Sequence, residues 1–108
     1  MKEYLVLIEG KMESDYAAEN MPQRIKEFRA WVEEIGDKFI SGQQLEQTGA
    51  YLKNNNTFFD GSFIESKEVI AGFVIITAVD IDEAISLAKS SPFANHFALI
   101  VRPLLGKM

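Results

Sequence analysis

Charged side chains gather in one short stretch of the chain, between residues 60 and 68. Asp60, Glu65 and Glu68 place three carboxylates within nine residues, and Lys67 lies among them. If these carboxylates share a partly desolvated cleft, their mutual repulsion raises the pKa of one of them toward a value useful for a general acid or base. Lys67 could then hold a carboxylate or enolate oxygen of a substrate. Asp60, Glu65 and Lys67 are therefore candidate catalytic residues, and Glu68 is a candidate ligand-binding residue.

The same residues have a purely structural interpretation. An aspartate before a glycine, as at Asp60, is typical of a turn in which the side chain bonds nearby backbone groups. Glu65 and Lys67 could pair with each other or cap the loop, and Glu68 would then be solvated. The types and spacing of the residues leave both interpretations open.

Three residues elsewhere are further candidates for binding a ligand. Arg102 follows the last apolar run, where its guanidinium could bind an anionic ligand or form an internal ion pair with one of the carboxylates above. His96 lies in a polar connection, as either a base or a solvated turn residue. Trp31 could line an apolar pocket for a planar ligand or belong to the core.

The composition excludes several classes of function. The chain has no cysteine and one histidine, so disulfides, thiolate catalysis and zinc sites built from cysteines or several histidines are excluded. We expect no metal and no cofactor. A net charge of −5 argues against binding to nucleic acid or an anionic membrane. The longest apolar run, residues 73–76, is far shorter than the roughly 20 residues of a membrane span. The N-terminus lacks the features of a signal peptide, which predicts a cytoplasmic protein.

The candidates must be positioned by elements that the apolar pattern predicts. Ile25, Phe28, Val32 and Ile35 form one helical stripe that Gly36 ends. A second helix follows the capping pair of Asp80 and Glu83, while short apolar or β-rich runs predict strands. The expected elements are strand 4–8, helix 21–35, a hairpin with strands around 45–52 and 57–60 on either side of the turn at Asn54–Asn56, strand 72–79, a helix from residue 81 that ends at Ser90–Pro92, and strand 97–101.

This order corresponds to a ferredoxin-like β-α-β-β-α-β arrangement in one α+β domain spanning residues 1–108. In that fold an antiparallel sheet carries two helices on one face, and the other face is uncovered. Strands 4–8, 72–79 and 97–101 are nevertheless apolar on both faces. The simplest cover for the open face is the same face of a second copy. We therefore expect a homodimer, with a small molecule as its possible ligand.

Residues 60–68 read Asp-Gly-Ser-Phe-Ile-Glu-Ser-Lys-Glu, and Gly72-Phe73 follow. This stretch closely resembles the signature of the YCII-related family in its DGPF branch, Asp-Gly-Pro-Phe followed by Glu-Thr-Lys-Glu and a glycine–aromatic pair. Further matches at 80–84, 91–92 and 101–103 extend the resemblance over nearly the whole chain. The resemblance implies a dimeric α+β barrel of ferredoxin-like protomers. It implies no settled activity, because a few members resemble dehalogenating or lactone-isomerising enzymes and some occur with sigma-factor-like transcription proteins.

Two departures from the family pattern affect the chemistry. Ser62 replaces the proline of the signature, which removes a restraint on the backbone after Gly61. The YCII branch resembles a possible enzyme because of a histidine–aspartate pair at its first helix. The corresponding positions here fall near Glu27 and Glu34, so that pair cannot be carried over.

Two functions remain as hypotheses. The first is a homodimeric protein that binds a small anionic or aromatic molecule in a cleft near the 60–68 loop, where cofactor-free acid–base catalysis could take place. The alternative is a non-catalytic protein-interaction or transcription-associated regulatory module, favoured by the lack of a recognisable nucleophile, metal set or phosphate loop.

Overall fold

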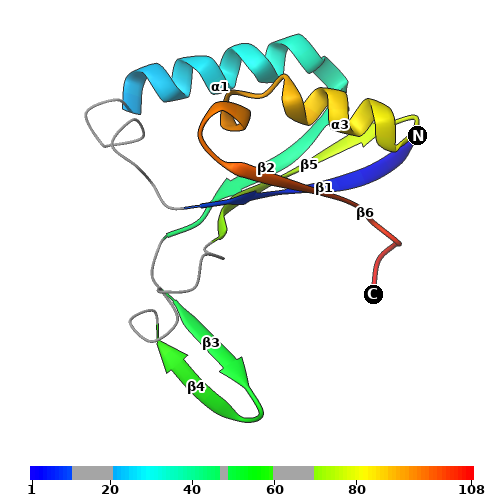
Figure 1. The fold of residues 1–108 in the computed structure, drawn as a ribbon. Coiled ribbons are helices and arrows are strands. Elements are labelled where there is room, and N and C mark those ends of the chain that lie inside the picture. The colour runs from blue at the N-terminus through cyan, green and yellow to red at the C-terminus, as the bar shows by residue number, and fades with distance from the viewer. Residues whose placement is uncertain (11–20, 47–48, 60–69) are drawn as a thin grey trace.

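The computed structural model describes residues 1–10, 21–46, 49–59 and 70–108, and its main layer is a four-stranded antiparallel sheet. The strands are β1 (Lys2–Glu9), β2 (Phe39–Gln44), β5 (Ile70–Ala78) and β6 (Ala98–Pro103), in the spatial order β2-β5-β1-β6. The helices α1 (Met21–Ile35) and α3 (Ile81–Lys89) lie together on one face of the sheet (Figure 1). This arrangement confirms the predicted ferredoxin-like α+β fold.

The core lies between the sheet and the helices. On β1 the side chains alternate, and Tyr4, Val6 and Ile8 are each less than 5% exposed. Their partners on β5 include Val74 and Ile76, which are 2% and 0% exposed. This alternation is the period of a strand with one face against a core, and each such aliphatic side chain contributes about 1.5–3 kcal/mol by its burial.

Aromatic side chains join α1 to the elements around it. Trp31, only 4% exposed, packs with its ring centroid 6.3 Å from those of both Phe39 and Phe93, and Phe28 joins the same cluster. Its indole Nε1 donates a hydrogen bond of 3.0 Å to Ser90 Oγ at the end of α3. Trp31 therefore lies at the centre of the buried face of α1, beside the stripe predicted from the sequence, and it fixes the two helices to each other.

The start of α3 has the predicted capping pair and a further ion pair. Asp80 Oδ1 accepts a hydrogen bond of 2.9 Å from the backbone N–H of Glu83, while Glu83 Oε1 accepts one of 2.8 Å from the N–H of Val79. Lys38, in the 3₁₀ turn η3 (Gly36–Lys38), lies 2.9 Å from the other carboxylate oxygen of Glu83. The hydrogen bond from Val79, together with Lys38, lowers the pKa of Glu83 below its ordinary value of 4.5.

Two parts of the predicted middle region need correction. The second strand of the sheet is β2, which follows α1 and η3 and was not predicted from the apolar pattern. The hairpin exists as β3 (Ala50–Lys53) and β4 (Asn56–Phe59), shorter than expected, but it forms a separate two-stranded sheet. β2 is an edge strand with an irregularity between Phe39 and Ser41 and a glycine at position 42, so its pattern lacks the β-branched run typical of a strand.

The face of the sheet away from the helices is apolar, as predicted, and half open to solvent. Leu7 of β1 lies between Phe73 of β5 and Ile100 of β6, and Leu5 lies beside Ile75. These side chains are partly buried, and Ile100 is 36% exposed. We call Leu5, Leu7, Phe73, Ile75 and Ile100 the open face. Across the described part of the chain, neither helix is long and apolar enough to cross a bilayer.

Candidate functional site

A cleft of about 430 Å³ lies between the first half of α1 and the β2–β5 side of the sheet. Its walls are largely apolar side chains from both layers, and Phe93 of the 3₁₀ turn η4 (Pro92–Asn95) and Phe97 contribute to them. A volume of this size suits a small organic molecule. Its apolar lining includes Ile8, Ile25, Phe28, Val74, Phe93 and Phe97.

Glycines on adjacent strands keep the sheet side of the cleft open. Gly42 of β2 lies opposite Val74, and Gly72 of β5 lies opposite Gln44. A Cβ atom at Gly72 would lie 2.7 Å from the backbone oxygen of Gln43, closer than real contacts allow. Gly72 therefore permits a close approach of the two strands beneath the cleft, where any other residue would push them apart.

The polar groups of the cleft come from α1 and β2. Arg24 and Arg29 line it from the helix, and Gln44 lines it from the strand. Arg24 is held near the start of α1, with Nη2 3.1 Å from Met21 Sδ. Within the described part of the chain, the lining carries two guanidinium groups and no carboxylate. The cleft therefore combines apolar walls with positive charge and amide groups, which favours an apolar ligand with an anionic oxygen.

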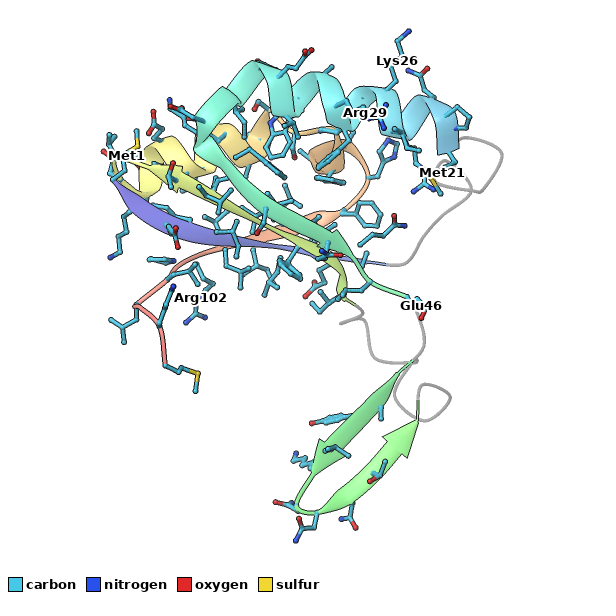
Figure 2. The ribbon with its side chains drawn as sticks, turned by 180° about the vertical axis from the view of Figure 1, so that it is seen from behind. Met1, Met21, Lys26, Arg29, Glu46 and Arg102 are labelled. Carbon is cyan, nitrogen blue, oxygen red and sulfur yellow. The ribbon has the colours of Figure 1, made fainter. Side chains whose placement is uncertain are left out.

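Figure 2 shows the labelled Arg29 and Met21 on α1, on the helix side of the sheet, with Arg102 on the opposite side. Arg102 is exposed on β6 and pairs in register with Leu5 at the edge of the open face. The structure therefore separates this candidate from the cleft. As a ligand-binding group, Arg102 could act only in a different site.

Trp31 and His96 both line a second, more open hollow of about 340 Å³, formed by α1, the end of α3 and η4. Trp31 is buried in the aromatic cluster described above, so its main role is in the core. His96 is exposed, and its backbone N–H donates to the carbonyl of Phe93 at 3.0 Å. Glu27 and Glu34, which fall near the positions expected for the histidine–aspartate pair of the YCII branch, line the same hollow.

The remaining candidates, Asp60, Glu65, Lys67 and Glu68, lie outside the described residues. The residues that follow them in the sequence, Ala71 and Gly72, line the cleft. The acid–base hypothesis therefore stays a prediction. The cleft is the place where the ligand of that hypothesis would bind.

Sequence reasoning missed the arginines and the phenylalanines that build the cleft. Arg24 lies four residues before Phe28 and Arg29 lies four residues after Ile25, so each arginine neighbours a residue of the apolar stripe on the helix surface. That position was a usable signal for cationic groups beside the sheet. Phe93 and Phe97 carried no such signal, because η4 and the turn after it bring them to the cleft through tertiary packing.

Comparisons with known proteins agree with this fold. The model of the YCII-related domain matches residues 4–105. A similar solved structure is 5-chloro-2-hydroxyhydroquinone dehydrochlorinase from Burkholderia phenoliruptrix AC1100, in complex with 2,5-dihydroxybenzoquinone. It has a TM-score of 0.54 and 20% sequence identity, over 97% of this chain and 95% of that chain. At this identity the likeness shows the fold alone. None of the curated proteins compared with the chain matches its sequence.

Proposed function

The chain belongs to the YCII-related domain family, and we propose that it is a homodimeric protein that binds a small aromatic anion in the cleft between α1 and the β2–β5 side of the sheet. The observation that carries the proposal is the lining of the cleft. Aromatic and aliphatic walls surround a volume of about 430 Å³, and two arginines supply its charge. A flat ring can be buried against the walls while an attached phenolate or carboxylate oxygen meets a guanidinium.

The structural neighbour supports the choice of ligand class by analogy. That enzyme is named for a chlorinated hydroxyhydroquinone, and its structure contains bound 2,5-dihydroxybenzoquinone. Both are planar rings that carry hydroxyl groups. One fold hosts many chemistries, so the argument for this chain rests on its own apolar walls and arginines.

Acid–base catalysis on the bound ring is the activity we propose for the 60–68 segment. A carboxylate of Asp60 or Glu65 would take a proton from the ligand, and the Lys67 ammonium would stabilise the negative charge that develops on a ring oxygen. The reaction needs neither a metal nor an organic cofactor. Glu68 is proposed to bind the ligand rather than to transfer the proton.

Binding can be tested by calorimetric titration with three probes of similar size: 2,5-dihydroxybenzoquinone, benzoate and uncharged benzyl alcohol. We expect the two anions to bind and the alcohol to bind more weakly. Arg29→Gln should weaken anion binding about 10- to 100-fold, because a hydrogen bond to a charged group contributes about 1.5–3 kcal/mol. Arg102→Gln is the matched control, because this exposed arginine lies outside the cleft lining. No binding of either anion, or equal effects of the two substitutions, would contradict the proposed site.

Catalysis can be tested separately by following exchange of ring protons of 2,5-dihydroxybenzoquinone in D₂O by NMR. We expect the protein to accelerate the exchange, and Asp60→Asn or Glu65→Gln to abolish the acceleration while binding persists. Unchanged exchange in both variants and in Lys67→Met would remove these residues from the mechanism. Binding without any exchange would leave a protein that binds the small molecule and does not catalyse this reaction.

The homodimer is proposed from the open face. Apolar side chains of three adjacent strands lie together there, and polar residues such as Glu3, Thr77 and Arg102 surround them. An apolar centre with a polar rim is the anatomy of a protein interface. Sedimentation velocity at micromolar concentration should give about twice the chain mass of 12.2 kDa. A single species at the chain mass would contradict the dimer.

A further inference from the structure

The β3–β4 hairpin stands apart from the other described elements. Its strands pair with each other in a sheet of their own. Figure 1 shows the hairpin projecting from the main sheet on the side away from α1 and α3. The radius of gyration, 15.1 Å, exceeds the roughly 13 Å typical of a compact domain of this length. The hairpin, which we call the arm, therefore extends the molecule instead of adding to its core.

The residues of the turn favour a regular hairpin over an irregular loop. Asn54 and Asn55 adopt φ values of 53° and 65°, the left-handed conformation that a two-residue hairpin turn requires and that asparagine tolerates. Lys53 then pairs with Asn56, and Leu52 with Thr57. A two-stranded hairpin alone is only marginally stable in water, so a defined hairpin is expected to have a surface to pack against.

The arm presents apolar side chains to solvent. Leu52 is 70% exposed and Tyr51 is 39% exposed, and all four residues of β3 are classed as exposed. Leu52 and Thr57 share one face of the arm, because directly paired residues point the same way. Lys53 lies on the other face. A partner on the leucine side would therefore bury an aliphatic group without burying the lysine.

From these observations we infer that the arm docks on a second copy of this chain, so that the two protomers of the dimer clasp each other. The inference rests on the homodimer proposed above. The arm and the open face project to the same side of the sheet, so a protomer seated on the open face lies beside the arm (Figure 1). In a two-fold dimer the contact occurs twice, once for each arm.

The area of the open face supports a second contact. Strands about 4.8 Å apart and rising about 3.3 Å per residue give the three strands of the open face a flat outline of roughly 300 Å² over about six residues. A stable dimer typically buries about 800 Å² of accessible surface from each partner. The flat outline is less than half of that, which leaves room for the arm as a separate part of the interface.

Two variants with the same new residue test the inference by sedimentation equilibrium. Leu52→Thr and Lys53→Thr each place a good strand former in β3, on opposite faces of the arm. We expect Leu52→Thr to raise the dimer dissociation constant roughly tenfold or more, because each dimer loses two buried leucines. Lys53→Thr should leave the constant within about twofold. NMR contacts between residues 53 and 56 confirm that the hairpin persists in both variants.

A second measurement locates the arm directly. The chain has no cysteine, so Lys53→Cys provides a single site for a spin label. In mixed dimers the spin label on one protomer should broaden amide signals of an isotope-labelled wild-type partner, which has no cysteine and therefore carries no spin label. Broadening together with the effect of Leu52→Thr supports the clasp. A dimer whose constant is unchanged by Leu52→Thr and whose partner signals stay sharp overturns the clasp but keeps the homodimer. A monomeric wild-type protein overturns both.

Discussion

At the scale of single residues, the hydrogen bond between Trp31 and Ser90 joins α1 to the end of α3. The indole Nε1 lies 3.0 Å from Ser90 Oγ, whose hydroxyl donates to the carbonyl of Leu87 at 2.7 Å. Ser90→Ala should destabilise the protein by about 1–3 kcal/mol, because it leaves the buried indole N–H without its acceptor. Urea unfolding at a fixed protein concentration measures the loss. Ser86→Ala, exposed on the same helix, should change stability by less than about 0.5 kcal/mol. Equal effects would contradict the role given to this bond.

The carboxylate of Glu83 should make stability depend on pH. Its pKa is lowered in the folded protein, chiefly by the N–H of Val79 and then by Lys38. The stabilisation is therefore present at pH values above the ordinary pKa of 4.5 and is lost as the pH falls through the lowered folded value. Glu83→Gln should be less stable than wild type at pH 7, and the difference should shrink in acid. Thermal unfolding across this range is the measurement. Asp82→Asn changes an exposed carboxylate of the same turn and should show a smaller pH-dependent difference.

At the scale of elements, local signals predicted those parts of the fold whose geometry is encoded in neighbouring residues. Gly36 ends α1 with a φ of 62°, and the Asp80–Glu83 pair begins α3 as expected. The strand β2 could not be predicted in this way. Its Ser-Gly-Gln-Gln end has weak strand preference, so pairing with β5 determines its structure. The cleft shares this property, because its arginines come from α1 while Phe93 and Phe97 come from η4 and the turn after it, near the opposite end of the chain.

The pairing of β2 with β5 should fail at Gly72 if a side chain is added. In Gly72→Ala the new methyl group would lie 2.7 Å from the backbone oxygen of Gln43, so the strands must separate. We expect a loss of about 1–3 kcal/mol in unfolding free energy and weaker benzoate binding, since both strands line the cleft. Gly49→Ala is the control, because a Cβ there has open space. A Gly72→Ala protein with wild-type stability would show that the close approach is dispensable.

At the scale of the whole molecule, exposed isoleucines lie both on the open face and at the start of α3. Ile100 on the open face is 36% exposed and Ile81 at the start of α3 is 38% exposed. The two side chains therefore have nearly the same exposure in one protomer and differ in the surface on which they lie.

If the open face is the dimer interface, Ile100→Thr removes apolar area that two protomers bury, whereas Ile81→Thr changes only solvent-facing surface. We expect Ile100→Thr to raise the dimer dissociation constant about tenfold and Ile81→Thr to leave it unchanged, as measured by sedimentation equilibrium. Equal dimer dissociation constants for the two variants would place the interface elsewhere, because the isoleucine of the open face would then contribute no more to dimerisation than the isoleucine of α3.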